Sequence, residues 1–280
     1  MRVLTSAQSM IRFAENAKLV NSSIGFVPTM GALHAGHLSL IEAAKRESDL
    51  VVVSVFVNPT QFNNASDLDK YPRTFDSDRS LLEDSGVDVM FFPSVEEIYP
   101  AGTEDQRKFE LDGLDELMEG PNRPGHFNGV VQVVTRLFDL VEPSKAFFGE
   151  KDFQQLAIIK HMSSKLGYRI DIVGCDTVRE SDGLAMSSRN VRLTSSGRTI
   201  APEIHRTLDA LRNELRTNSV EEGLARAKAE LLASQEIELE YLELVDPITL
   251  KRATDDSISI QGCIAAWIDD VRLIDNMRVK

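Results

Sequence analysis

The chain has too little cysteine to be a disulfide-stabilised protein. Among its 280 residues only 2 are cysteines, Cys175 and Cys263, and each lies in or beside an apolar segment. Disulfide scaffolds are short and rich in cysteine, so we expect two reduced thiols in the core. Tryptophan is equally scarce. The single one, Trp267, lies in an apolar segment, and we expect it in the core or at an interface.

Long apolar runs and a net positive charge are also missing. No stretch reaches the roughly 18 apolar residues of a membrane span, and the N-terminal segment lacks the charged and apolar regions of a signal peptide. We therefore expect a cytoplasmic protein without a membrane partner. The formal net charge is −13, which disfavours a nucleic-acid partner because phosphate backbones are bound by basic surfaces.

What the chain does contain is an alternation of buried strands and helices. The expected strands of the first part are Ile24–Val27, Leu50–Val57, Val87–Phe92, Ala146–Phe148 and Ile170–Val173. Helices between such strands are typical of a parallel sheet with helical crossovers. We predict an α/β fold, with a Rossmann-like doubly wound domain over residues 1–176 and a smaller α/β C-terminal domain over residues 177–280.

The ends of the chain give more local predictions. Thr5 and Gln8 have the spacing of a capping box and predict the start of a first helix. In the C-terminal domain we expect two helices, Arg198–Thr217 and Val220–Ser234, and three strands, Glu240–Val245, Ser257–Ile260 and Cys263–Trp267.

The segment from Pro28 to His37, Pro-Thr-Met-Gly-Ala-Leu-His-Ala-Gly-His, leads from the first buried strand into a helix that begins near Gly36. A helix N-terminus offers unpaired N–H groups to phosphate, Gly31 permits a turn, and His34 and His37 add donors. We predict a nucleotide-binding turn. A helix cap, a surface role or a metal pair are the alternatives, and the lack of a nearby third ligand argues against the metal pair.

Polar residues also follow two other expected strands, in the segments Asn58–Phe62 and Gly149–Asp152. Ligands of doubly wound sheets collect at the carboxyl ends of the strands. Each segment alone is also compatible with an ordinary turn or solvated loop. Together they favour a ligand site.

Five segments carry a family resemblance: Pro28–His37, Phe56–Phe62, Tyr71-Pro72-Arg73, Phe148–Gln155 and Met186-Ser187-Ser188-Arg189-Asn190. In this order, over essentially the whole chain, they resemble the pantothenate synthetase family. The His-x-Gly-His motif alone would indicate only the wider HxGH nucleotidyltransferase superfamily, which includes class I aminoacyl-tRNA synthetases.

The resemblance implies a ligase that uses ATP and Mg²⁺ to join (R)-pantoate to β-alanine. The pantoate carboxylate would attack the α-phosphate of ATP, which releases pyrophosphate, and the β-alanine amine would then attack the pantoyl adenylate, which releases AMP. The resemblance also implies a homodimer. The C-terminal domain would carry the Met-Ser-Ser-Arg loop and cover the site.

The resemblance assigns roles to individual residues. It implies His37, His34, Lys151 and Arg189 as catalytic residues. Contacts to ATP are expected from Met30, Gly31, His34, Gly36, His37, Gly149, Lys151, Asp152, Val178, Met186, Ser187, Ser188 and Arg189. Pantoate is expected to contact Pro28, Met30, Gln61 and Gln155, whose amides can match its hydroxyls and carboxylate. Magnesium is expected at Asp78 and Asp152, with Asp76 as a lesser candidate.

Two details depart from the family pattern. The segment Asn63–Asp69 is poorer in glycine than is usual, and Phe153 stands where tyrosine is common. We expect Asn63–Arg73 to close over the nucleotide as a lid that excludes water.

Parts of the sequence are also compatible with two other function classes. One is a nucleotidylyltransferase or a small synthetase acting on RNA, which the net charge and the missing second lysine of the Lys-Met-Ser-Lys-Ser loop argue against. The other is a non-catalytic ATP sensor, which would not require Gln61 and Gln155 for a second substrate.

Overall fold

The computed structural model describes residues 1–63, 65–100 and 109–280, which form two compact units. Unit 1 comprises Met1–Leu111, Arg123–Glu150 and Ile158–Asp176, and unit 2 comprises Asp112–Asn122, Lys151–Ala157 and Thr177–Lys280. The two short segments of unit 2 interrupt unit 1 along the chain. A division at residues 176 and 177 alone does not anticipate them, because both are set by contacts with residues far away in sequence.

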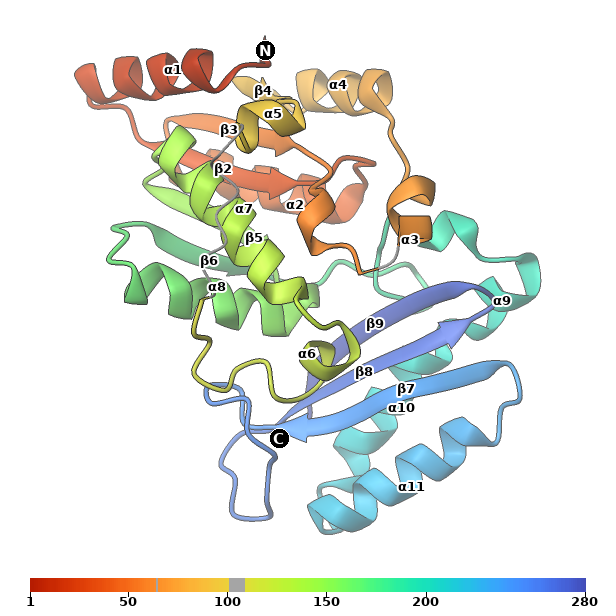
Figure 1. Cartoon of the computed structure of the whole chain (residues 1–280). Helices are drawn as coiled ribbons and strands as arrows, with labels where there is room; N and C mark the ends of the chain where they lie inside the picture. Colours follow the sequence, from red (N-terminus) through yellow and green to blue (C-terminus); the bar gives the residue numbers. More distant parts are fainter. Residues whose placement is uncertain (64, 101–108) are drawn as a thin grey trace. The chain divides into compact units, whose positions relative to one another are not determined.

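Unit 1 is built on a six-stranded sheet in the order β1-β4-β3-β2-β5-β6, and its strand pairs are parallel (Figure 1). The strands are β1 (Arg2–Leu4), β2 (Ile24–Thr29), β3 (Leu50–Val55), β4 (Val89–Phe91), β5 (Lys145–Gly149) and β6 (Asp171–Cys175). The expected doubly wound parallel sheet is confirmed. Strand β1 was not expected, because three residues carry too little pattern.

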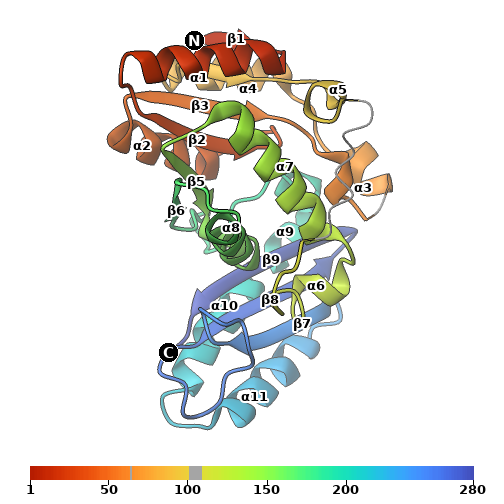
Figure 2. The ribbon, with the colours of Figure 1, turned by 60° about the vertical axis from the view of Figure 1, so that its left-hand side comes forward.

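Helices cover both faces of this sheet. The helices and short helical turns of the first half are α1 (Ala7–Leu19), α2 (Ala35–Glu47), η1 (Pro59–Gln61), α3 (Ala65–Lys70), α4 (Phe75–Asp84) and α5 (Val95–Ile98). They are followed by α7 (His126–Val141), η2 (Glu150–Asp152) and α8 (Phe153–Lys165). Apolar residues of α2 and α4 pack with Val27, Val53 and Met90 on one face. Helix α7 lies on the other face (Figure 2). There its Phe138 packs edge-on against Phe26 and Phe148.

The strand order reverses direction at β2. From β2 the chain proceeds to β3 and β4 on one side, whereas β5 and β6 lie on the other side. In open α/β sheets, ligands bind at such a switch point, outside the carboxyl ends of the strands. The turn after β2 and the carboxyl end of β5 are therefore neighbours at the position where a ligand is expected, since Phe26 of β2 pairs with Ala146 of β5.

Unit 2 is built on an antiparallel sheet of β7 (Ile237–Val245), β8 (Gln261–Ile268) and β9 (Val271–Arg278). The other elements are α6 (Glu119–Asn122), η3 (Asn190–Arg192), α9 (Ser195–Ile200), α10 (Glu203–Glu214) and α11 (Val220–Leu232). Helices α10 and α11 cover one face of the sheet and α6 lies on the other (Figure 1). The smaller second α/β part is confirmed.

Three predictions for unit 2 need correction. Ser257–Ile260 is not a strand, since the only regular strand in this region begins at Gln261. Strand β9 was missed, although its residues alternate between the two faces of the sheet. The single helix expected over Arg198–Thr217 is two helices, because the chain leaves α9 at Ala201 and Pro202 begins a new one.

The structure also tests the predictions for the first helix cap, the cysteines and the tryptophan. Helix α1 is capped by Ser6, whose hydroxyl accepts the N–H of Ser9, so the capping pair lies one residue later than Thr5 and Gln8. Both cysteines are free thiols, with Cys263 buried and Cys175 half-buried at the end of β6. Burial raises the pKa of both thiols. Trp267 is half-buried and donates its ring N–H to Glu240. None of the helices within the described ranges is long and apolar enough to cross a membrane.

Candidate active site

The turn after β2 presents two histidines at the N-terminus of α2. Gly31 has φ +83° and Ala32 has φ +50°, so the chain reverses through the left-handed region where glycine costs least. His34 is the N-cap of α2, and its Nδ1 accepts the N–H of Gly36 at 3.1 Å. His37 Nδ1 accepts the N–H of His34 at 3.2 Å. The two ring centroids lie 4.1 Å apart.

These contacts indicate which nitrogen of each neutral imidazole ring carries the proton. A neutral imidazole that accepts a hydrogen bond at Nδ1 carries its proton on Nε2. Each ring is therefore set to donate from Nε2 beside the N–H groups at the helix start, an arrangement that suits a phosphate.

Asp78 of α4 holds the same turn. Its carboxylate accepts the N–H of Ala32 at 3.0 Å and of Leu33 at 2.8 Å, and it also accepts the hydroxyl of Thr74 at 3.1 Å. Asp78 is buried, with 2% of its surface exposed. Both carboxylate oxygens thus already have donors, so Asp78 stabilises the turn between β2 and α2. Asp76, nearer the start of the same helix, is exposed.

Gln61 of η1 lies in a network of fixed side chains. Asn58, which is 1% exposed, donates to Gln61 Oε1 at 2.9 Å and to the carbonyl of Gly129 at 3.2 Å. Tyr99 donates to Asn58 Oδ1 at 2.9 Å. The amide nitrogen of Gln61 faces Met30 Sδ at 3.5 Å. The bond from Asn58 to Oε1 orients the amide, so its nitrogen is the donor that Gln61 offers to a ligand beside Met30.

Helix α7 approaches η1 closely. A Cβ at Gly129 would lie 2.4 Å from the carbonyl oxygen of Thr60, a distance that no side chain can adopt without a shift of backbone. At the start of the helix, buried His126 contacts the carbonyl oxygen of Gln61 through Nδ1 at 2.9 Å. The close approach and this contact set the backbone position of Gln61.

In unit 2, Lys151 and Gln155 follow β5 on η2 and α8. Both are half-buried, and neither side chain forms a hydrogen bond or ion pair with the residues that the structure describes. Gln154, in contrast, is 4% exposed and binds the segment before α6, donating to the carbonyls of Leu114 and Leu117 and accepting the N–H of Glu119. Asp152 is exposed.

The Met-Ser-Ser-Arg segment leaves a short hairpin of unit 2. Val178 accepts the N–H of Met186 at 3.0 Å, and Arg179 forms an isolated antiparallel bridge with Ala185. Beyond the hairpin, the N–H of Arg189 bonds to Ser187 Oγ at 3.2 Å. Met186, Ser187, Ser188 and Arg189 are all half-buried. The hydroxyls and the guanidinium are thus grouped on one compact loop.

The predicted residues therefore fall into two groups. Unit 1 carries Pro28, Met30, Gly31, His34, Gly36, His37, Gln61, Asp78 and Gly149, and unit 2 carries Lys151, Asp152, Gln155, Val178, Met186, Ser187, Ser188 and Arg189. Among the residues that the structure describes, no three His, Cys, Asp or Glu side chains cluster as a metal site.

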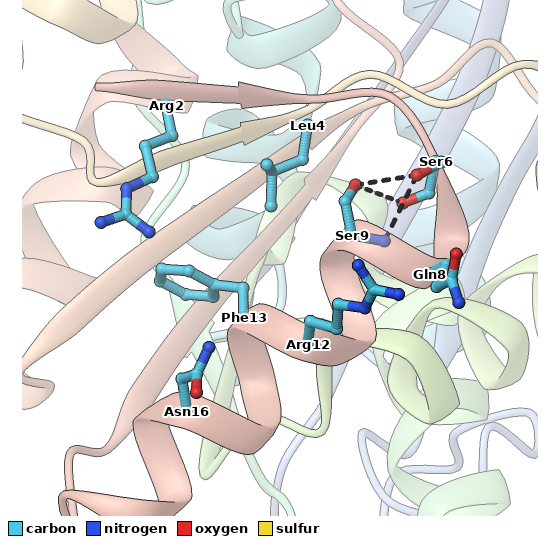
Figure 3. Close-up of a pocket in the computed structure, with 8 residues that line it drawn as sticks. All are labelled: Arg2, Leu4, Ser6, Gln8, Ser9, Arg12, Phe13 and Asn16. Carbon is cyan, nitrogen blue, oxygen red and sulfur yellow. Dashed lines mark hydrogen bonds between the residues drawn. The ribbon is translucent and has the colours of Figure 1, made fainter.

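A cavity of about 230 Å³ lies elsewhere in unit 1, between β1 and α1 (Figure 3). Arg2, Arg12 and Phe13 line it together with Ser6 and Ser9, which bond to each other. No residue predicted from the sequence as part of the site contributes to its lining.

Sequence reasoning missed Asn58, Tyr99, His126 and the role of Asp78 at the turn. Asn58 lies in the Asn58–Phe62 segment that the sequence favours as part of a ligand site, so its polar side chain could have been named as a candidate. Tyr99 and His126 are 41 and 65 residues from their partners, and nothing in the local pattern of either marks the contact.

Comparison with known proteins decides the family. The family model described as pantoate-β-alanine ligase matches residues 2–278. A pantothenate synthetase of Porphyromonas gingivalis is 49% identical over 283 residues and covers 100% of both chains. The chain belongs to the pantoate-β-alanine ligase family. The family and the enzyme class expected from the sequence, a ligase of pantothenate biosynthesis, are thereby confirmed.

Solved structures of this family agree in fold. A crystal structure of pantothenate synthetase from Thermus thermophilus has a TM-score of 0.93 at 45% identity, over 100% of this chain and 99% of that chain. The pantoate-β-alanine ligase of Francisella tularensis, complexed with beta-gamma ATP and beta-alanine, has a TM-score of 0.83 at 36% identity, over 100% and 98% of the two chains.

Proposed function

We propose that the chain condenses (R)-pantoate with β-alanine at the expense of ATP, through a pantoyl adenylate. Membership of the pantoate-β-alanine ligase family carries this proposal. The Francisella tularensis relative, complexed with beta-gamma ATP and beta-alanine, supports the choice of these two substrates. The pantoate carboxylate attacks the α-phosphate and pyrophosphate leaves. The β-alanine amine then attacks the acyl carbon and AMP leaves.

The first step develops negative charge on the phosphate oxygens. His34 and His37 donate to them from Nε2, since Nδ1 of each ring already accepts a backbone N–H. Gly31, Gly36 and Gly149 bring backbone close to the nucleotide. Lys151, Ser187, Ser188 and Arg189 add charge and hydroxyl donors, and Met186 and Val178 complete the contacts to ATP.

Pantoate is bound by amide groups and an apolar wall. Gln61 donates from its amide nitrogen, because the bond from Asn58 to its carbonyl oxygen orients the amide. Gln155 has both amide groups available within the described structure. Pro28 and Met30 form the wall. A substrate without a matching hydroxyl leaves one amide unpaired, which gives strong discrimination.

Magnesium that enters with ATP takes most of its ligands from phosphate oxygens and water, so one or two protein carboxylates suffice. Exposed Asp152 fits this role, whereas Asp78 fits it less well because its oxygens accept two backbone N–H groups. The metal would neutralise charge on the phosphates. We further propose a homodimeric cytoplasmic enzyme in which Asn63–Arg73, with Asn64 outside the described residues, closes over the nucleotide.

A pyrophosphate–ATP exchange assay tests the reaction. We expect exchange of labelled pyrophosphate into ATP that requires pantoate and needs neither β-alanine nor RNA. Exchange that requires a nucleotide acceptor instead would contradict the proposal. Hydrogen exchange of the Asn63–Arg73 segment tests the lid, since equal exchange with and without ATP plus pantoate is incompatible with closure.

A further inference from the structure

Two consecutive residues of β9 bind segments of unit 2 that carry residues assigned to ATP: Asn276 bonds to the backbone of Lys151, and Asp275 to Arg179 in the hairpin before the Met-Ser-Ser-Arg loop. Asp275 and Asn276 are 4% and 7% exposed. Neighbouring residues of a strand point to opposite faces of the sheet. Asp275 pairs with Ile264 of the core beneath α10 and α11, whereas Asn276 pairs with Cys263 on the face that the segment Lys151–Ala157 helps to cover.

On the first face, Asp275 fastens the hairpin that leads to the Met-Ser-Ser-Arg loop. Its carboxylate receives both terminal nitrogens of Arg179, at 2.6 and 3.0 Å. Arg179 also donates to the carbonyl of Gly183 at 3.1 Å, so one guanidinium ties the hairpin end to the strand. A bidentate pair of this kind fixes orientation as well as distance.

Hydrogen bonds join this hairpin to the Met-Ser-Ser-Arg loop that follows it. Arg179 pairs with Ala185, and the carbonyl of Ala185 accepts the side-chain N–H of Asn190 at 3.1 Å. The backbone N–H of Asn190 in turn donates to the carbonyl of Ser187 at 3.0 Å. Ser187, Ser188 and Arg189 therefore lie between two points that are both fixed to the hairpin.

On the second face, Asn276 holds the backbone at Lys151. Its amide nitrogen donates to the carbonyl of Lys151 at 2.9 Å, and its amide oxygen accepts from Gln261 at 2.7 Å. The Gln261 contact orients the amide so that its nitrogen faces Lys151. The Lys151 amino group itself has no partner within the described structure, so its direction depends on this backbone.

We propose that Asp275 and Asn276 are positioning residues, which hold the Ser187–Arg189 loop and Lys151 in the register that ATP requires. The inference rests on the proposed roles of Lys151 and Arg189. A displacement of about 1 Å can cost a catalytic group up to 10²-fold in rate, so small losses of these contacts should be visible in the adenylation step.

A double-mutant cycle tests Asn276. Asn276→Ala removes the donor to Lys151, and Asn276→Asp keeps the shape and the acceptor for Gln261 while removing the same donor. We expect either variant to lower pantoate-dependent pyrophosphate exchange by roughly 10-fold. In a Lys151→Ala background the same change should have almost no further effect, because Asn276 acts through Lys151. Asp275→Asn should have a smaller effect in an Arg189→Ala background than in the unmodified chain, because part of its effect acts through Arg189.

The matched control is Glu240→Gln, which removes a carboxylate from the half-buried pair with Arg272 in the same sheet. It should lower the melting temperature but leave exchange within about twofold, since no site residue depends on it. Equal loss of exchange in Glu240→Gln and Asp275→Asn, or additive losses in the Lys151→Ala background, would overturn the inference. Full exchange in Lys151→Ala would instead contradict the proposed function from which the inference starts.

Discussion

Each of the two segments assigned to phosphate is fastened by a buried aspartate from another element, but the partners differ. Asp78 holds the turn after β2 through the backbone N–H groups of Ala32 and Leu33. Asp275 binds the guanidinium of Arg179 in the hairpin that precedes the Ser187–Arg189 loop. The first contact needs only a short turn, whereas the second needs a specific cationic side chain. The contact of the first aspartate is thus made by neutral backbone donors, and that of the second by an ion pair.

The largest effects should come from the side chains proposed to bind the phosphates directly. We expect His37→Ala, in the first segment, and Lys151→Ala, in the second unit, each to lower adenylate formation by roughly 10²–10³, the scale of a lost transition-state donor. Pantoate-dependent exchange measures both. Near-normal exchange in His37→Ala would show that the turn after β2 does not act on the α-phosphate, and the comparison of the two segments would fail. Near-normal exchange in Lys151→Ala would contradict the role proposed for that side chain.

A smaller loss is expected when the fastening aspartate of the first segment is altered. Asp78→Asn turns one acceptor into an NH₂ group that faces a backbone N–H, and a buried donor without a partner costs about 1–3 kcal/mol. We expect a lower free energy of unfolding in urea and roughly 10-fold slower exchange. Asp84→Asn is the control, because Asp84 is exposed on the same helix. Equal free energies of unfolding and equal exchange rates in the two variants would show that Asp78 does not hold the turn.

The local part of this architecture could be predicted from the sequence. Strand, glycine turn and helix start are contiguous between Ile24 and Glu47, so their pattern predicts the histidines' position at a helix N-terminus. The fastening contacts could not be predicted. Asp275 is 96 residues from Arg179, and Asn276 is 125 residues from Lys151. Strand β9, which carries both, was itself missed.

Adjacent glutamines give a sharper contrast between support and binding. Gln155→Ala should raise the KM for pantoate by roughly 10-fold, since a lost hydrogen bond to a polar substrate is worth about 0.5–1.5 kcal/mol or more. Gln154→Ala should leave that KM near normal and instead lower the melting temperature, because the buried amide of Gln154 bonds to three backbone groups. Steady-state kinetics and thermal unfolding of the two variants separate the roles. A higher pantoate KM in Gln154→Ala alone would reverse the assignment.

The smallest effect concerns the ion pair that distinguishes Asp275 from Asp78. Burial raises the pKa of Asp275, but His205, with Nδ1 3.6 Å away, and Arg179 outweigh it, so the pKa lies below its usual value. A depressed carboxyl pKa stabilises the fold above the unfolded pKa of about 4, and this stability is lost as pH falls through the folded pKa. The difference in free energy of unfolding between the unmodified chain and Asp275→Asn should therefore stay constant from about pH 7 to 5 and shrink below about pH 4. Urea denaturation across this range measures it. A difference that already shrinks between about pH 7 and 5 would show that the ionised carboxylate of Asp275 is not the source of this stability.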